Sequence, residues 1–246
     1  MTKWLLVTGG GKRLGREIVL AASAAGWTPI VHYNSSARDA EAVAEETGGV
    51  AVGGDLSANG AGKRIFAAAR EAAGAPISGL INSASIFEHD DAMTMTEEAL
   101  HKNYQIHTIA PMMLSQAFAA QVPDEGGVIV NILDQKLFGL NADHMSYTIS
   151  KQALHGATLL LARGLAPKVR VVGVAPGYNL PSPGQPQEVY DRLAPTVNVL
   201  ARRLTPQDVA EAVVFALNAR AITGQVIIAD NGEHLKAAPR DIIFSE

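Results

Sequence analysis

Short apolar runs alternate with longer alanine-rich stretches of helical period along almost the whole chain, and this alternation limits the possible folds more than any other feature. Glycine, proline or asparagine stands at most of the joints, as is typical between strands and helices. We expect strands over 4–8, 28–33, 50–53, 79–82, 128–133, 170–175 and 226–229. We expect helices over 14–25, 37–47, 61–73, 97–121, 146–166 and 206–218. Most strands are continuously apolar, as strands are when helices cover both faces of a sheet. The pattern predicts an α/β fold with a doubly wound, parallel, seven-stranded sheet.

A length of 246 residues permits one large domain or two small ones. No internal repeat, low-complexity segment or Pro/Ser-rich linker divides the chain, so we predict a single domain over residues 1–246. The longest irregular segment, about 176–203, is rich in proline, and we expect it to form a substrate loop, with an ordinary surface loop as the alternative. The tail 233–246 follows the last expected strand, and it either packs on a neighbouring subunit or frays.

Composition excludes several classes of function. The 20 basic and 24 acidic residues are interspersed, so no basic stripe is available for nucleic acid or for an anionic membrane. The chain has no cysteine, which excludes disulfides, thiolate metal sites and cysteine nucleophiles. Its seven histidines lack the spacing of metal ligands, and we predict no metal. The N-terminal apolar run is too short for a signal peptide, and no window approaches the ~18 apolar residues of a membrane span, so we expect a cytoplasmic protein.

A glycine-rich turn joins the first expected strand to the first expected helix, where residues 8–15 read TGGGKRLG. Glycine lets the backbone turn sharply and approach a diphosphate, and the start of the helix offers free N–H groups to the anion. Because the turn lies inside the first βαβ unit, it predicts a dinucleotide site with contacts from Gly9, Lys12, Arg13 and Leu14.

The end of the second expected strand distinguishes between the two nicotinamide cofactors. In folds that select NAD, a carboxylate at this place accepts hydrogen bonds from the ribose hydroxyls. Here residues 33–36 read YNSS, and the first acid after them is Asp39. Cations and hydroxyls without an acid suit a 2′-phosphate, and we predict NADP(H), bound at this end by Lys12, Arg13, Tyr33, Asn34, Ser35 and Ser36. The alternative is that Lys12 and Arg13 are solvated loop charges.

Tyr147 and Lys151 lie four residues apart at the start of the fifth expected helix, so the phenol and the ammonium share one helical face. A neighbouring cation favours the ionised form of a tyrosine and tunes it for proton transfer. A pair at this spacing is also common on protein surfaces, so its meaning depends on the other motifs of the chain.

Motifs in the expected order make the chain similar to the short-chain dehydrogenase/reductases over essentially its whole length. They are residues 8–15, Asp55-Leu56, residues 82–85 (NSAS), Asn131-Ile132, Tyr147 with Lys151, residues 175–177 (APG) and residues 222–225 (ITGQ). The resemblance implies hydride transfer between a nicotinamide and a small substrate, with Tyr147 as proton donor and Lys151 binding the nicotinamide ribose and acidifying the phenol. Tyr147 and Lys151 are also implied cofactor contacts, and the further ones are Asp55, Leu56, Asn82, Ser83, Ala84, Pro176 and Gly177.

Three positions depart from the usual pattern of that family. Arg13 replaces a glycine of the turn, Asp134 replaces the catalytic serine, and His107 aligns with a helix asparagine. Arg13 and Asp134 together resemble the pteridine reductases, including the bacterial dihydromonapterin reductases. This resemblance implies that Arg13 contacts both cofactor phosphate and pterin, and that Phe87 and the nicotinamide sandwich the pterin. The substrate-binding residues that it implies are Arg13, Ser85, Phe87, Asp134, Tyr147 and Asn179.

An aspartate near the tyrosine suits the chemistry of a C=N substrate. A serine only hydrogen-bonds a substrate oxygen, whereas a carboxyl whose pKa is raised by burial holds and delivers a proton. Reduction of a pterin C=N bond needs a hydride on carbon and a proton on nitrogen. The alternative is that Asp134 pairs with Lys151, Lys136 or a histidine and that the site is inactive.

The resulting hypothesis is an NADPH-dependent reductase of pterin- or folate-like substrates, with Asp134, Tyr147 and Lys151 as catalytic residues. A short-chain reductase of ketones, sugars or acyl thioesters is the first alternative, and an NADPH-binding sensor without turnover is the second. We also expect a homo-oligomer, either a dimer or a tetramer, and a structural role for His107.

Overall fold

The computed structural model describes residues 2–182, 184–236 and 238–244. Within these residues a parallel sheet of seven strands has the order β3-β2-β1-β4-β5-β6-β7, so the predicted fold class is confirmed. The strands are β1 (Trp4–Val7), β2 (Thr28–Tyr33), β3 (Val50–Gly53), β4 (Ile77–Asn82), β5 (Gly127–Ile132), β6 (Val169–Pro176) and β7 (Val226–Ala229). The α-helices are α1 (Arg13–Ala24), α2 (Ala37–Thr47), α3 (Ala61–Ala73), α4 (Glu97–Tyr104), α5 (Ala110–Ala119), α6 (Met145–Gly164), α7 (Gln187–Leu193) and α8 (Pro206–Asn218).

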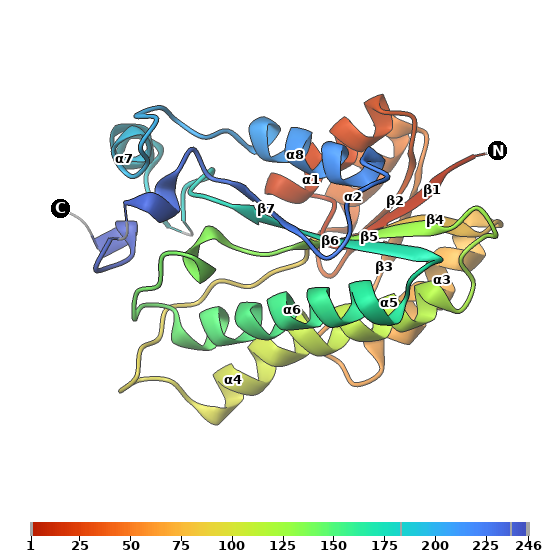
Figure 1. Ribbon diagram of the computed structural model, residues 1–246, viewed down its shortest axis with the longest axis horizontal. Coiled ribbons are helices and arrows are strands. Elements are labelled where there is room, and N and C mark those ends of the chain that lie inside the picture. The colour runs from red at the N-terminus through yellow and green to blue at the C-terminus, as the bar shows by residue number, and fades with distance from the viewer. Residues whose placement is uncertain (1, 183, 237, 245–246) are drawn as a thin grey trace.

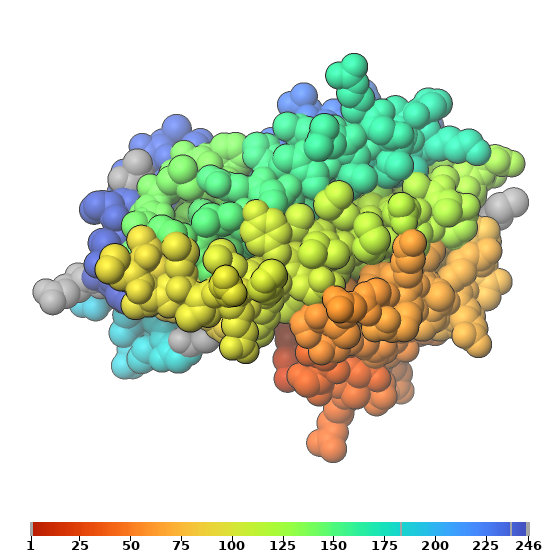
Figure 2. All heavy atoms as spheres, turned by 90° about the horizontal axis from the view of Figure 1, so that it is seen from below, coloured from red at the N-terminus to blue at the C-terminus, as the bar shows by residue number. Residues whose placement is uncertain are grey.

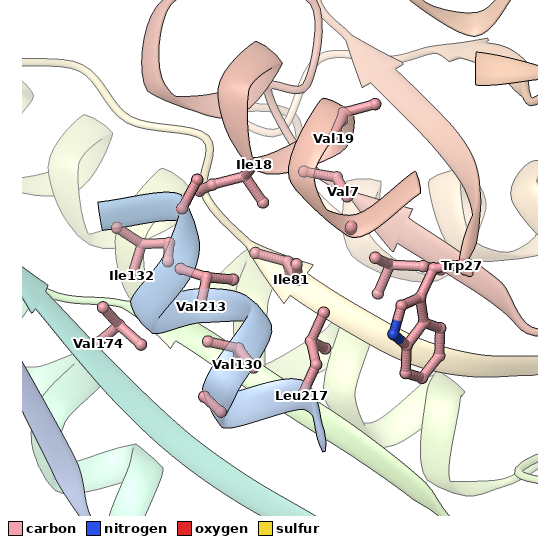
Figure 3. Packing of buried hydrophobic residues seen from close by; sticks show 14 of the residues in the cluster. Val7, Ile18, Val19, Trp27, Ile81, Val130, Ile132, Val174, Val213 and Leu217 are labelled. Atoms are coloured by element: carbon pink, nitrogen blue, oxygen red, sulfur yellow. The ribbon is translucent and has the colours of Figure 1, made fainter. Parts of the chain in front are cut away.

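Helices cover both faces of the sheet (Figure 1). α1, α2 and α8 lie on one face, and α3, α5 and α6 lie on the other, with α4 beside α6. On the first face, Ile18 of α1 and Val213 of α8 pack in one cluster with Val7, Val130 and Val174 of the sheet (Figure 3). Full burial of such a side chain contributes about 1.5–3 kcal/mol relative to exposure. The helices therefore stabilise the sheet from both sides, which explains why its strands are continuously apolar.

The strand order reverses between β1 and β4, and this reversal opens a crevice at the carboxyl ends of the strands. The turn after β1 passes through Gly9, whose φ is +67°. A side chain at Gly15 would bring its Cβ within 2.0 Å of the Gly9 carbonyl oxygen, so the turn requires glycine there. His32 accepts a hydrogen bond from the Gly9 N–H through Nδ1 (3.3 Å) and donates from Nε2 to the Gly54 carbonyl (3.0 Å). Burial lowers the pKa of His32 to about 4, so a neutral ring holds the turn in place.

The helix expected over 97–121 is not a continuous α-helix. It divides into α4, a π-helical turn over Gln105–Ile109 and α5. Pro111 explains the division, because it has no N–H for the His107 carbonyl and its ring crowds that oxygen. The Ala110 N–H instead bonds the Gln105 carbonyl, five residues back. Turns of this kind are frequent at functional sites, and this one carries His107.

The remaining differences from expectation are small. β4 begins two residues earlier than expected, β5 one residue earlier, and β6 gains a residue at each end. The segment 176–203, expected to be irregular, contains the short helix α7. Among the described residues no helix is long and apolar enough to cross a membrane, and no group of three acidic or histidine side chains is arranged to hold a metal ion.

Candidate active site

A cavity of about 970 Å³ lies at the carboxyl ends of the strands. Its walls come from the glycine turn, from the loops that follow β2 to β6, and from the C-terminal tail. All predicted site residues line this cavity except Asn82. Asn82 is buried behind the wall, where its Nδ2 donates to Asn131 Oδ1 at 2.8 Å. The expected cofactor contact of Asn82 is therefore corrected to a supporting role, since its side chain joins the ends of β4 and β5.

The glycine-turn end of the cavity has the features of a diphosphate site. α1 begins at Arg13, and no side chain caps its first N–H groups, so these groups are available to an anion. Lys12 forms an ion pair with Asp39 at 3.0 Å, and both side chains are about half exposed. Exposed pairs contribute only about 0–1 kcal/mol, so Lys12 can exchange this partner for a phosphate. Residues 34–36 line the adjoining wall and contain no carboxylate.

The middle of the cofactor wall is ordered by hydrogen bonds from small side chains. The Thr8 hydroxyl accepts from the Ser83 N–H (2.9 Å) and the Ala84 N–H (3.0 Å), which fixes the loop after β4 against the glycine turn. Asp55 Oδ1 accepts from the N–H and the hydroxyl of Ser57, at 2.8 and 2.7 Å. The carboxyl group is thereby oriented beside Leu56 and Tyr33, which also line the wall.

The three predicted catalytic side chains lie together at the centre of the cavity. The Tyr147 hydroxyl donates to Asp134 Oδ2 at 2.6 Å, and Asp134 Oδ1 accepts from the Lys136 N–H at 2.8 Å. The Lys151 ammonium donates to the Ile132 carbonyl at 2.7 Å and lies 5.7 Å from the centroid of the Tyr147 ring. The Lys136 ammonium pairs with the C-terminal tail. Both lysine ammonium groups therefore have partners other than Asp134.

Burial sets the charges of this cluster. It raises the pKa of Asp134, although the hydrogen bond from Tyr147 and the nearby lysines oppose the shift. Burial and the neighbouring Asp134 raise the pKa of Tyr147 well above its ordinary value, so the phenol is protonated. Burial lowers the pKa of Lys151 to about 8. The expectation that Lys151 acidifies the phenol is not met in this structure, because burial and Asp134 act in the opposite direction.

The predicted substrate-binding residues lie on the side of the cavity beyond Tyr147. The Phe87 ring stacks on His144, with 3.8 Å between centroids, and meets the Tyr147 ring edge-on at 4.8 Å. Arg13 donates from Nη2 to the Pro181 carbonyl at 2.7 Å, which links the glycine turn to the irregular segment. Asn179 is oriented by a hydrogen bond of 2.6 Å from Nδ2 to the Gly177 carbonyl.

The C-terminal tail folds back over the chain's own cavity, an arrangement that neither expectation for this segment included. The tail lies at the same end of the molecule as α7 (Figure 1). Lys136 Nζ and Asp241 Oδ2 form an ion pair at 3.0 Å, and their side chains are only 4% and 14% exposed. Arg240 donates to both carboxylate oxygens of Asp143, and these hydrogen bonds lower the pKa of Asp143 to about 2. Opposite charges thus hold the tail against the loop after β5.

Glu233 is a further carboxyl group of the cavity, and sequence reasoning missed it. Its Oε2 accepts from the Tyr178 N–H at 2.7 Å, and its Oε1 accepts from Gln135 Nε2 at 2.9 Å. Burial raises the pKa of Glu233 to about 8. The residue joins the tail to the loops after β5 and β6, and no motif in the sequence marks it.

Replacing Asp241 with asparagine tests the tail contact. The change leaves Lys136 as a buried cation without its partner, and breaking a buried pair costs about 3 kcal/mol. We expect the free energy of unfolding, measured with urea, to fall by that amount. Asp124→Asn is the matched control, because Asp124 pairs with Lys168 at 4.0 Å on the surface, and this substitution should change the stability little. Equal effects of the two substitutions would contradict the proposed contribution of the tail.

Comparisons with known proteins place the chain in a family. The family model described as enoyl-(acyl carrier protein) reductase matches residues 11–234. The chain belongs to the short-chain dehydrogenase/reductase family. Members of this family use NAD(P)H, and the protein is an oxidoreductase. The sequence prediction of this family is therefore confirmed.

Several reductases resemble this short-chain reductase over nearly the whole chain. The structure of alternative dihydrofolate reductase 1 (FolM) from Brucella canis, solved in complex with NADP, superposes with a TM-score of 0.87 at 33% identity, over 99% of this chain and 98% of that one. Pteridine reductase 1 of Leishmania tarentolae is 28% identical over 95% of this chain and 96% of its own. L-xylulose reductase of Mesocricetus auratus is 29% identical over 92% and 94% of the two chains. The relatives thus include enzymes named for pteridine or folate substrates and one named for a sugar.

Proposed function

We propose that this short-chain reductase transfers a hydride from NADPH to a C=N bond of a pterin- or folate-like substrate. The observation that carries the proposal is the hydrogen bond of 2.6 Å between Tyr147 and Asp134. Asp134 stands where carbonyl reductases of this family have serine, and burial raises its pKa. A carboxyl group with a raised pKa, hydrogen-bonded to a protonated phenol, suits the protonation of a ring nitrogen.

The cavity residues fit NADPH. The uncapped start of α1 suits the diphosphate, and the wall of residues 34–36 with Lys12 suits a 2′-phosphate. Bound there, the nicotinamide supplies the hydride. FolM of Brucella canis, which shares the fold over 99% of this chain, was solved with NADP, and this likeness supports the same cofactor here.

The residues divide the work of the reaction between them. Lys151 is anchored by the Ile132 carbonyl, which leaves its remaining N–H groups for the ribose and its charge beside the phenol. In the structure Tyr147 donates to Asp134 at 2.6 Å. In the reaction a protonated Asp134 becomes the donor across this contact, while Tyr147 turns its hydroxyl proton toward the substrate nitrogen. Phe87 offers an aromatic surface for a flat ring, with His144 stacked behind it.

A reductase of sugar or ketone carbonyls is the second candidate, and the likeness to L-xylulose reductase favours it. A carbonyl oxygen also accepts a proton from tyrosine, so Tyr147 and Lys151 serve either reaction. Asp134 distinguishes them, because a carboxyl group can hold and deliver the proton that a ring nitrogen needs, whereas a serine hydroxyl at this position serves carbonyl reduction in this family.

A crystal structure with NADP and a dihydropterin tests the proposed site. We expect the bicyclic ring between the nicotinamide and Phe87, with a ring nitrogen within hydrogen-bonding distance of Tyr147 or Asp134. A dihydropterin seated elsewhere, or none bound at millimolar concentration, would contradict the proposal.

We predict that Arg13 strengthens the binding of NADPH and lowers the stability of the folded protein. Its φ of +52° is a left-handed conformation that costs about 1–2 kcal/mol for a residue with a side chain. We expect Arg13→Gly to raise the free energy of unfolding by about 1 kcal/mol and to raise KM for NADPH about tenfold through loss of the guanidinium. Arg13→Lys keeps the strain and a charge, and it serves as the control. Lower stability of the glycine variant, or an unchanged KM, would argue against this role.

We further propose that the protein forms a dimer or a tetramer. Figure 2 shows the outer face formed by α5 and α6. Large apolar side chains are exposed on these helices and on the π-helical turn before α5: Ile109, Met112, Leu159 and Leu160. Exposed apolar groups of this kind mark contact surfaces. Sedimentation velocity measures the assembly directly, and a monomer at micromolar concentration would contradict it.

A further inference from the structure

The π-helical turn between α4 and α5 holds His107 in one tautomer. The hydroxyl group of Ser150 donates to the Tyr147 carbonyl at 2.7 Å, so its single hydrogen is already used. Ser150 Oγ lies 2.9 Å from His107 Nδ1, and it acts there as an acceptor. The His107 ring therefore carries its hydrogen on Nδ1.

The other nitrogen of the ring, Nε2, is an acceptor. The Ile86 N–H, which can only donate, points at Nε2 from 3.1 Å. Burial and the charge of Lys151 lower the pKa of His107 well below its ordinary value, so the ring stays neutral. Tyr147, whose ring meets that of His107 at 5.3 Å, and Lys151 are the titratable groups of α6 near it, and neither adds a negative charge that would favour a second proton.

An acceptor at Nε2 determines the direction of the Ser85 hydroxyl. Ser85 Oγ lies 3.0 Å from Nε2 and 3.3 Å from the Ile86 carbonyl, and the Tyr147 hydroxyl is a third hydrogen-bond partner of its side chain. All three partners belong to the protein, so the single hydroxyl hydrogen is used within the protein and is not offered to a substrate. Ser85 itself is exposed and lines the cavity, and it presents oxygen lone pairs to a bound substrate.

We propose that His107 is a specificity-determining positioning residue, which fixes Ser85 as a hydrogen-bond acceptor and so favours an N–H-bearing heterocycle over a carbonyl compound. The inference rests on the proposed function and extends it from the reaction to the choice of substrate. A pterin-like ring carries ring and amino N–H groups that Ser85 can accept, whereas a ketone oxygen needs a donor and finds lone pairs there. Leaving a buried polar group without a complementary partner is a strong source of discrimination.

Two substitutions at His107 distinguish the role of the Nδ1 donor from that of the Nε2 acceptor. Asparagine reaches only as far as Nδ1, so His107→Asn keeps a donor toward Ser150 and loses the acceptor toward Ser85. Glutamine reaches the position of Nε2, and its carbonyl oxygen can replace that acceptor. The exposed His101 of α4 supplies the control substitution His101→Asn, which touches none of these groups.

The kinetic test compares these variants with a dihydropterin and with a ketone. We expect His107→Asn to raise KM for the dihydropterin about tenfold, to change kcat less than about twofold, and to lower or leave unchanged KM for the ketone. His107→Gln should restore KM for the dihydropterin to within about threefold of the wild-type value, and His101→Asn should change neither substrate. Equal losses on both substrates, or a loss confined to kcat, would overturn the proposal.

A spectroscopic test does not depend on the substrate. In protein labelled with ¹⁵N-histidine, the His107 resonances, assigned by their absence from His107→Gln, should show a protonated Nδ1 and a bare Nε2 at every pH from about 5 to 9. A proton on Nε2, or a titration near the ordinary histidine pKa, would refute the assignment of Ser85 as an acceptor. If the tautomer is as expected but no dihydropterin reacts, the proposed function is wrong, while the assignment of Ser85 as a hydrogen-bond acceptor is retained.

Discussion

Replacing Tyr147 with phenylalanine is expected to lower kcat for dihydropterin reduction about a thousandfold. The phenol hydroxyl is the group that donates to Asp134 at 2.6 Å, and burial keeps it protonated, so its removal breaks the path of the proton to the substrate. Binding of NADPH should change little, because the ring remains and the glycine turn is distant. Steady-state measurement of NADPH oxidation gives kcat, and fluorescence titration gives the affinity for the cofactor.

The control for this substitution is Tyr104→Phe. Tyr104 ends α4 and does not line the cavity, so the loss of its hydroxyl should leave kcat unchanged. A Tyr147→Phe variant that retains more than about a tenth of the wild-type kcat would show that another group delivers the proton.

Replacing Asp134 with asparagine or serine should have the second largest effect. Asparagine keeps the shape of the side chain but holds no transferable proton, and we expect kcat with a dihydropterin to fall about a hundredfold. Serine restores the usual residue of the family, so Asp134→Ser should lose dihydropterin turnover to the same extent while ketone reduction is retained or improved. The two variants together measure whether the carboxyl group selects the C=N reaction.

The pH profile separates the carboxyl group from its neighbours. The pKa of Asp134 is raised, so its protonated form persists to higher pH, and the wild-type rate of reduction should fall as pH rises through that raised value. Lys151 loses its charge above its pKa of about 8, in the same direction. The pH profile of Asp134→Asn should retain only the fall in rate that accompanies the loss of charge on Lys151. A profile identical in shape to that of the wild type would show that Asp134 does not titrate in the reaction.

The sequence was sufficient to predict the sheet and the centre of the site. Continuous apolar runs separated by helical segments permit little other than a doubly wound sheet, and Asp134 and Tyr147 follow the end of β5 and begin α6. Both positions lie at the carboxyl edge of the sheet, so their contact could be expected from topology. The resemblance to the pteridine reductases, and not topology, predicts Phe87 at the site, and Phe87 lines the same cavity as the glycine turn.

Two features could not be predicted, for different physical reasons. The π-helical turn results from Pro111, but proline in a helix more often produces a kink or an end, and only the packed structure decides among these outcomes. The tail depends on Lys136 and Asp143 meeting Asp241 and Arg240, which lie about a hundred residues further along the chain. No local sequence pattern predicts such a pairing, and a buried ion pair can be identified only when the positions of both partners are known.

The rate of NADPH oxidation by the purified wild-type protein is the most direct test of whether the substrate is pterin- or folate-like. Dihydropterins, dihydrofolate, a ketose and an aromatic ketone are compared at equal concentration, with NADH in parallel. We predict that kcat/KM for at least one pterin- or folate-like substrate exceeds that for either carbonyl compound, that NADPH is preferred to NADH, and that the activity disappears in Tyr147→Phe. Turnover of the carbonyl compounds with none on any dihydropterin or dihydrofolate would contradict it.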